Sequence, residues 1–302
     1  MRALVSATYA PLDQIGITEL PTPVAGPGQL LVRVQAASLN PLDPKLVTGV
    51  MREMIPVQHP YVLGFDAAGT VEAVGEGVTG FAPGDAVVAY TDSSVAEYTV
   101  VDAAGAVVRK PENVDAVRAA ALPVAGLTAA QLVEAAALKS GDRVLIVGAT
   151  GGVGAYAVQL AAQLGAEVWA TARPDETNFV VALGAKHAVD YTSGDITAQA
   201  EGIDVVIDLV NFGAGIPSAV LRDGGRILSP LGGWDENTYD RGVTATYVGV
   251  VPTADGLREL LDAVAAGTLA VEVSGTSAFD DSAKATNDFF GSHKRGKHVI
   301  TF

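Results

Sequence analysis

Cysteine is absent from this sequence, and its absence excludes disulfide bonds, a thiolate zinc site and a cysteine nucleophile. Hydrophobic residues make up 49% of the chain, yet no continuous apolar run reaches the about 20 residues that a membrane-spanning helix needs. The apolar run in residues 1–5 is too short for a secretory signal, and we interpret it as a first strand. We therefore expect a soluble, cytoplasmic protein with a sizeable core.

Positive charge is also scarce. The chain has 19 Lys and Arg residues against 34 Asp and Glu residues, which gives a formal net charge of −15, and the acidic residues are spread along the chain. A surface of this sign repels polyanions, so we expect neither nucleic acid nor a membrane as a partner. A polyanionic cofactor would need a locally positive pocket in order to bind.

A chain of 302 residues suits two modest domains, and its patterning changes once along its length. In the first part, short alternating runs between glycine turns predict a small, strongly curved β-barrel. Its predicted strands are residues 2–8, 15–19, 29–39, 70–74, 85–90, 94–101 and 106–109. The last segment, residues 288–302, is predicted to end in a strand that returns to this first domain.

From residue 114 the period becomes helical, and strands and helices then alternate, which predicts a doubly wound parallel sheet of the α/β class. The predicted helices are residues 114–122, 127–138, 153–164, 175–183, 214–222 and 254–266. The predicted strands are residues 144–147, 167–171, 204–209 and 226–229. Residues 244–251 are β-branched and fall late, so we expect an edge strand there, and an open edge invites pairing in a homodimer.

A strand, a glycine turn and a helix follow one another in residues 144–164. Gly151 would let the backbone approach a pyrophosphate, Gly154 would let the helix pack on the strand, and the first N–H groups of the helix would hold phosphate charge. Ala149 stands where the first glycine is usual. The alternative is an ordinary glycine-rich turn, but this context favours a dinucleotide site. Its candidate residues are Ala149, Thr150, Gly151, Gly152, Val153 and Gly154.

Several motifs occur in one order along the chain. They are S-L-N-P-L-D-P-K at 38–45, G-F-D-A-A-G-T-V-E-A-V-G at 64–75, A-A-L-P at 120–123, G-L-T-A at 126–129, G-G-V-G at 151–154 and G-K-H-V at 296–299. In these motifs the chain resembles the medium-chain dehydrogenase/reductase superfamily over essentially its whole length. It is most similar to the zinc-independent branch, the quinone oxidoreductases of the zeta-crystallin type and their enone-reducing relatives.

The departures from the zinc enzymes of that superfamily favour this branch. Asn40, Phe65 and Ala125 stand where those enzymes have zinc ligands, and only the carboxylate at Asp66 is retained. One carboxylate does not suffice, because a catalytic zinc needs about three protein ligands. The four histidines, His59, His187, His293 and His298, are scattered without ligand spacing, so we predict no metal.

The resemblance implies two domains and a location for the active site. A GroES-like (chaperonin-10-like) β-barrel catalytic domain would comprise residues 1–122 and 273–302, and a Rossmann domain would comprise residues 123–272. The active site would lie in the cleft, over the nicotinamide. The resemblance also places Thr128 and Tyr191 near the cofactor, although Thr128 is equally suited to cap a helix N-terminus. Asn211 and Leu231 follow predicted strands at the carboxyl edge of the sheet, where ligands bind in such folds.

The end of the second Rossmann strand bears on the choice of cofactor. An NAD site usually has Asp or Glu there, roughly 20 residues past the glycine turn, to bond the ribose 2′-hydroxyl. Here Glu167 stands at the start of the strand, whereas Arg173 follows Thr171 at its end. A guanidinium can bind a 2′-phosphate bidentately, so we predict NADPH. The alternative is that Arg173 is a solvated residue at the start of a helix.

Quinones and α,β-enones accept hydride because negative charge moves onto a carbonyl oxygen, which then needs hydrogen-bond donors. Asn40 is the candidate donor and Lys45 a possible second one, while Asp43 either orients Lys45 or closes the turn. Residues 46–60 contain no tyrosine to act as a proton donor and Tyr61 comes late, so we expect a proton from water or from ribose hydroxyls. Residues 47–57 and 234–241 would form the walls around the substrate.

We therefore predict NADPH-dependent, zinc-independent reduction of a small quinone or α,β-unsaturated carbonyl by a homodimer. Two alternatives remain. One is an enone or enoyl reductase with little quinone activity, and the other is a non-catalytic NADPH-binding protein.

Overall fold

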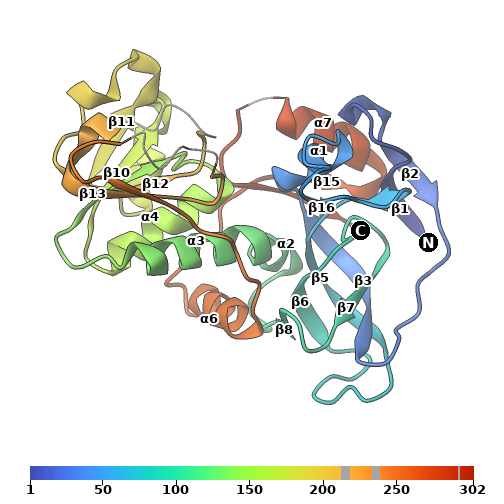
Figure 1. Ribbon diagram of the computed structural model, residues 1–302. Helices are drawn as coiled ribbons and strands as arrows, with labels where there is room; N and C mark the ends of the chain where they lie inside the picture. The colour runs from blue at the N-terminus through green and yellow to red at the C-terminus, as the bar shows by residue number, and fades with distance from the viewer. Residues whose placement is uncertain (212–217, 233–238, 292) are drawn as a thin grey trace. The chain divides into compact units, whose positions relative to one another are not determined.

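The chain divides into two compact units in the computed structural model, which describes residues 1–211, 218–232, 239–291 and 293–302 (Figure 1). Unit 1 comprises Met1–Val124 and Pro252–Phe302, and unit 2 comprises Ala125–Val251. Residues 252–272, which we predicted to belong to the Rossmann domain, group with unit 1. Their helix α6 (Ala254–Ala265) packs near strand β8, and Asn113 Nδ2 donates to the Ala265 carbonyl at 2.8 Å. The predicted domain limits themselves stay a prediction.

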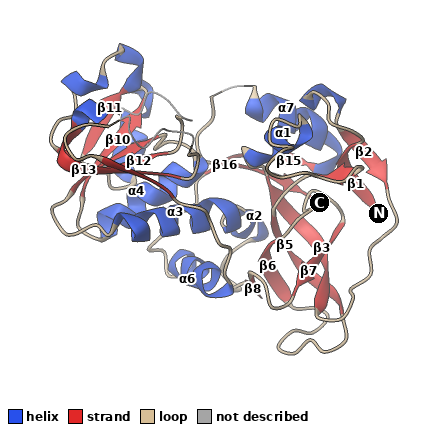
Figure 2. Cartoon of the chain, viewed as in Figure 1, coloured by secondary structure: helices blue, strands red, loops and turns tan. Residues whose placement is uncertain are grey.

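Unit 1 is built on two sheets, as the glycine-punctuated strand pattern predicts (Figure 2). A seven-stranded sheet has the order β15-β16-β3-β5-β6-β8, with β7 paired to β3, and a three-stranded sheet has the order β2-β1-β4. The strands are β1 (Arg2–Ser6), β2 (Gly16–Glu19), β3 (Gln29–Ser38), β4 (Tyr61–Val62), β5 (Asp66–Val74), β6 (Ala86–Tyr90), β7 (Tyr98–Asp102), β8 (Val107–Arg109), β15 (Val273–Ala278) and β16 (Lys297–Thr301). The helices are α1 (Leu42–Val47), α2 (Ala116–Ala120), α6 and α7 (Ser282–Phe290).

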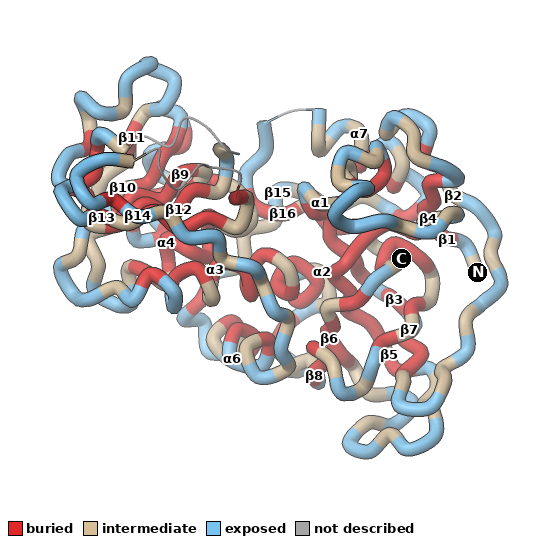
Figure 3. The backbone as a smooth tube through the Cα atoms, in the orientation of Figure 1, coloured by how far each residue is buried: buried red, intermediate tan, exposed pale blue. Residues whose placement is uncertain are grey.

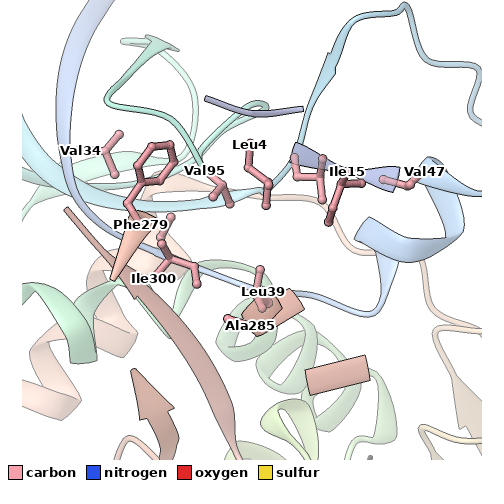
Figure 4. Packing of buried hydrophobic residues seen from close by; sticks show 11 residues of the cluster. Leu4, Ile15, Val34, Leu39, Val47, Val95, Phe279, Ala285 and Ile300 are labelled. Carbon is pink, nitrogen blue, oxygen red and sulfur yellow. The ribbon is translucent and has the colours of Figure 1, made fainter. Parts of the chain in front are cut away.

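The predicted return of the C-terminal segment to the first domain is confirmed. Strand β16 pairs antiparallel with β3, with Val299 opposite Ser38. Apolar side chains from β1, β3, α1, α7 and β16 meet in one cluster, which Figure 4 shows around Leu4, Leu39 and Ile300. Most residues of β3 are buried (Figure 3), and so are Ser38 at its end, Asp66 at the start of β5 and Lys297 at the start of β16.

Unit 2 contains the predicted doubly wound parallel sheet. Its six strands have the order β11-β10-β9-β12-β13-β14, and every pair is parallel. They are β9 (Arg143–Val147), β10 (Glu167–Ala172), β11 (His187–Asp190), β12 (Ile203–Asp208), β13 (Leu221–Ser229) and β14 (Thr244–Tyr247). The helices are α4 (Gly152–Gln163), α5 (Thr177–Ala182) and α3 (Pro123–Ala136), whose first two residues belong to unit 1. This is the Rossmann order, which reverses direction beside β9, and ligands bind at the carboxyl ends of strands at such a point.

Several predicted elements differ from the structure. The strands predicted over 70–74 and 94–101 are β5 and β7, with bounds that differ by up to four residues. The helix expected over 127–138 begins at Pro123, since proline is favoured in the first helical turn, so Thr128 lies inside α3 and is not an N-cap. Of the helix expected over 214–222, residues 214–217 lie outside the described residues, and strand β13 already begins at Leu221. The edge strand expected over 244–251 is confirmed at the edge but ends at Tyr247. Across the described residues, no helix combines the length and apolarity that crossing a membrane requires.

Candidate active and cofactor-binding sites

Five polar side chains gather inside unit 1, and we call them the Asp66 cluster. Strand β3 supplies Ser38, the turn and helix after it supply Asn40 and Asp43, β5 begins with Asp66, and β16 begins with Lys297. None of these residues is more than 3% exposed. The pairing of β3 with β5, with Ser38 opposite Asp66, brings together segments that are far apart in the sequence.

The carboxylate of Asp66 is the centre of the cluster. Its Oδ2 accepts hydrogen bonds from Ser38 Oγ, from Asn40 Nδ2 at 2.9 Å and from Lys297 Nζ at 3.1 Å. Its Oδ1 accepts a hydrogen bond from the backbone N–H of Val124 at 2.7 Å, in the first turn of α3. A buried carboxylate is costly unless it is paired and hydrogen-bonded, and this one is both.

The side-chain amide of Asn40 makes three contacts in the cluster. Its Nδ2 donates to Asp66 Oδ2 at 2.9 Å and to the Ser38 carbonyl at 3.3 Å, and its Oδ1 accepts from Lys297 Nζ at 2.5 Å. The bond to Ser38 is the long one, so it is the one that another acceptor replaces most easily. Asn40, the predicted donor, therefore has one hydrogen that is only weakly engaged.

Asp43 contacts backbone groups and not Lys45. Its two oxygens accept from the N–H groups of Asn40, at 2.8 Å, and of Gly64, at 2.9 Å. Burial raises the pKa of Asp43 to about 7, although these hydrogen bonds and Lys297 act in the opposite direction. Within the described part of the chain, the half-buried Lys45 side chain has no hydrogen bond or ion pair. The structure thus brings Asn40 and Asp43 together and leaves Lys45 apart. Of the two roles considered for Asp43, closing the turn fits its contacts, and orienting Lys45 does not.

Sequence reasoning did not select Lys297, Asp66 or Ser38 as site residues. Lys297 precedes a short apolar run at the C-terminus, and its place beside Asn40 depends on the register of β16 against β3. The signal available in the sequence is slight: a lysine opens the short strand K-H-V-I-T, and an unpaired lysine is almost never fully buried.

The donor set of the cluster does not fit a zinc ion. Phe65 has no ligand atom, Asp66 is occupied by three side chains, and the ammonium group of Lys297 would repel a second cation beside it. Among the residues that the structure describes, no group of three His, Asp or Glu side chains is placed to hold a metal ion.

The glycine turn of unit 2 has the geometry of a phosphate-binding turn. A Cβ on Gly154 would lie 2.2 Å from the Gly148 carbonyl oxygen, so this glycine allows the close packing of α4 on the turn after β9. A Cβ on Gly151 would meet only that same oxygen, at an ordinary 3.4 Å, which leaves room there for a ligand. The N–H groups of the first turn of α4 have no acceptor within the helix and are suited to an anion.

Thr171 and Arg173 lie where β10 ends beside this turn. Thr171 Oγ1 accepts from the Gly148 N–H at 2.9 Å, so this side chain holds the turn itself. Arg173 Nε donates to Tyr191 Oη at 3.0 Å, and no described residue accepts from its two terminal nitrogens. The guanidinium is therefore oriented by Tyr191 with its terminal N–H groups available to a phosphate.

The other predicted cofactor residues lie in unit 2, and most are occupied by local contacts. Thr128, Ala149 and Thr150 are buried. Asn211 Nδ2 donates to Asp208 Oδ2 at 2.8 Å, and the Leu231 N–H donates to Ser229 Oγ at 3.1 Å. Asn211 and Leu231 follow the carboxyl ends of β12 and β13, as predicted.

Two family models match the chain. The alcohol dehydrogenase GroES-like domain matches residues 26–112, and the zinc-binding dehydrogenase domain matches residues 183–300. Together they span parts of both units.

Curated relatives and solved structures match nearly the whole chain. A quinone-oxidoreductase homolog, chloroplastic, from Spinacia oleracea is 32% identical, covering 95% of this chain and 94% of the relative. An NADPH-dependent alkenal/one oxidoreductase, chloroplastic, from Arabidopsis thaliana is 30% identical, covering 99% of this chain and 79% of the relative. The solved quinone oxidoreductase from Coxiella burnetii has a TM-score of 0.89 and 31% identity, covering 100% of this chain and 99% of that one.

The fold, the glycine turn and these matches indicate the same family. Both plant relatives carry the word chloroplastic in their names, so the predicted cytoplasmic location stays a prediction. The chain is an oxidoreductase that belongs to the quinone oxidoreductase family of the medium-chain dehydrogenase/reductase superfamily.

Proposed function

We propose that this chain uses NADPH to reduce a small quinone or α,β-unsaturated carbonyl, without a catalytic metal. The observation that carries the proposal is the glycine turn of unit 2, with room at Gly151 and an oriented guanidinium at Arg173. The names of the relatives, quinone oxidoreductase and NADPH-dependent alkenal/one oxidoreductase, support the substrate class.

The residues of unit 2 would hold the cofactor through its charged groups. The N–H groups of Gly152, Val153 and Gly154 would donate hydrogen bonds to the pyrophosphate at the N-terminus of α4. The terminal nitrogens of Arg173 would bind the 2′-phosphate, and Tyr191 would keep the guanidinium in place. A 2′-hydroxyl offers this guanidinium no negative charge, so we expect NADH to bind more weakly.

The Asp66 cluster would stabilise the charge that develops on the substrate. A bound nicotinamide cofactor would supply a hydride, which would leave negative charge on the carbonyl oxygen of the substrate. Asn40 would donate to that oxygen with the hydrogen that otherwise makes the 3.3 Å bond to the Ser38 carbonyl. The second hydrogen of the amide keeps its hydrogen bond to Asp66 Oδ2, so the amide stays fixed while it donates to the substrate. A proton from water completes the reduction.

We also propose that the chain forms a homodimer through β14. This strand is the outermost strand of the unit 2 sheet, and Thr244, Thr246 and Tyr247 on it are exposed. An open edge of this kind presents unpaired backbone groups to a second copy of the same strand.

The test begins with calorimetric titration of NADPH and NADH, followed by NADPH oxidation with 1,4-benzoquinone and with 3-buten-2-one. We expect NADPH to bind more tightly and benzoquinone to be reduced. Turnover of the enone alone would replace the proposal with an enone reductase. Tight NADPH binding without turnover of either acceptor would replace it with a non-catalytic NADPH-binding protein.

A further inference from the structure

We propose that Lys297, acting with Asp66, is a positioning residue that fixes the side-chain amide of Asn40 in the orientation needed to donate to substrate. The inference rests on the proposed function, in which Asn40 is the donor. It adds a residue from the C-terminal strand to a site otherwise formed by the first part of the chain.

The amide of Asn40 has two orientations that differ by a half-turn, and its neighbours accept only one. Lys297 can only donate hydrogen bonds, so it requires the amide oxygen to face it, and that contact is 2.5 Å long. An ionised Asp66 can only accept, so it requires the amide nitrogen, at 2.9 Å. The flipped amide would place its NH₂ group against the ammonium and its oxygen against the carboxylate.

All three hydrogens of the Lys297 ammonium have acceptors inside the unit. These acceptors are the Leu39 carbonyl at 2.8 Å, Asn40 Oδ1 at 2.5 Å and Asp66 Oδ2 at 3.1 Å. No hydrogen is left for a substrate, so Lys297 acts through Asn40. A donated charge-assisted bond at Oδ1 also polarises the amide and makes its N–H groups stronger donors.

The ion pair is poorly suited to stabilise the fold by itself. The side chains of Lys297 and Asp66 are 4% and 0% exposed, and two charges removed from water recover their lost hydration only through close contacts. An apolar pair of similar size often stabilises a protein as much or more. We therefore attribute the charges of Lys297 and Asp66 to the hydrogen-bond donors and acceptors that they present to the amide of Asn40.

The backbone before β16 is shaped to deliver this lysine. Gly296 has φ +61, and a Cβ there would lie 2.3 Å from the Glu272 carbonyl oxygen. The same carbonyl accepts the Lys297 N–H at 2.8 Å. The chain therefore enters β16 through a turn that requires glycine and places the lysine side chain beneath Leu39 and Asn40.

The test compares Lys297→Met with the control Lys284→Met, which removes an exposed lysine of α7 in the same unit. For Lys297→Met we expect kcat with 1,4-benzoquinone to fall roughly 10- to 100-fold, because a misplaced donor loses its alignment. We expect KM for NADPH to stay unchanged, because unit 2 binds the cofactor. If the activity of Lys297→Met falls only as far as the fraction of the protein that still binds NADPH, the role of Lys297 is merely structural and the proposal is overturned.

A second measurement does not depend on activity. In the wild-type protein we expect slow hydrogen exchange of the Asn40 side-chain amide by NMR, its signals being assigned from their absence in Asn40→Ala. Lys297→Met should make this exchange fast, while Lys284→Met should not. Unchanged exchange in Lys297→Met would overturn the positioning role. Fast exchange in Lys297→Met, together with a wild type that reduces neither acceptor, would overturn only the proposed function.

Lys297→Met leaves the buried Asp66 carboxylate without its cation, so this variant can fail to fold. In that case the double variant Lys297→Met/Asp66→Asn takes its place, because it removes both charges together. The same fall in kcat and the same fast exchange at Asn40 are expected. Wild-type values for both in the folded double variant would contradict the proposal.

Discussion

At the scale of single residues, the cluster around Asp66 shows what sequence patterns can and cannot predict. Asn40 and Asp43 are three positions apart in one motif, and both were selected from the sequence and found in the cluster. Lys297 stands 257 positions away from Asn40, and only the strand register brings the two together. A pattern within one segment contains no information about that register.

Asp43 predicts a pH dependence of stability. Burial raises its pKa to about 7, whereas an aspartate in the unfolded chain has a pKa of about 4. Between these values the folded state binds more protons than the unfolded state, so the free energy of unfolding falls as the pH rises from 4 to 7. The contribution of this group is at most about 4 kcal/mol.

Urea unfolding at pH 5 and pH 8 measures this effect. Asp43→Asn should flatten the difference between the two pH values, and the exposed control Asp13→Asn should leave it as in the wild type. If the difference in stability between pH 5 and pH 8 is as large in Asp43→Asn as in the wild type, another group of the cluster causes the pH dependence.

Gly151 and Gly154 predict different outcomes for the same substitution. Gly151→Ala places a methyl group where only an ordinary 3.4 Å contact exists, so we expect weaker NADPH binding at unchanged stability. Gly154→Ala meets backbone at 2.2 Å and should destabilise the protein by about 1–3 kcal/mol. Calorimetric titration and thermal unfolding of both variants check this; equal NADPH affinity in Gly151→Ala and wild type would refute a pyrophosphate contact there.

At the scale of elements, segments with a clear period were predicted well, and most errors lie at the ends of elements. The alternation of β9, α4 and β10 has a clear period, and the structure has these elements within a few residues of the predicted ranges. Helix α3 begins four residues before its predicted start, because Pro123 acts as a first-turn residue and not as a break. Asp66 then binds the Val124 N–H of that first turn, a contact between segments that local patterns do not relate.

The edge strand β14 predicts how the proposed dimer can be separated. The Val248 N–H donates to Ser229 of β13, so by the alternation of strand hydrogen bonds the Tyr247 N–H faces the open edge. Tyr247→Pro removes that donor and should shift the protein from dimer to monomer. Tyr247→Val keeps the N–H group and should remain dimeric. Light scattering after size-exclusion chromatography distinguishes the two, and a dimeric Tyr247→Pro would argue against this interface.

At the scale of the whole molecule, the two units divide the work of a reductase. Unit 2 has a glycine turn and a guanidinium suited to a phosphorylated dinucleotide, and unit 1 has a buried amide fixed between an ammonium and a carboxylate. The motifs of the sequence predicted the family, and they selected Asn40, Asp43 and the glycine turn as candidate site residues. They did not predict that Lys45 would stand apart from the cluster, since that depends on which side of α1 faces the interior of unit 1.

The most direct test of the account is the ratio of kcat/KM for NADPH to that for NADH, with 1,4-benzoquinone as acceptor, in the wild type and in Arg173→Ala. We expect the wild type to prefer NADPH, and Arg173→Ala to lower kcat/KM for NADPH roughly tenfold or more, the effect of losing a charged hydrogen bond, with little change for NADH. A wild type that prefers NADH, or a ratio that Arg173→Ala does not change, would contradict the account.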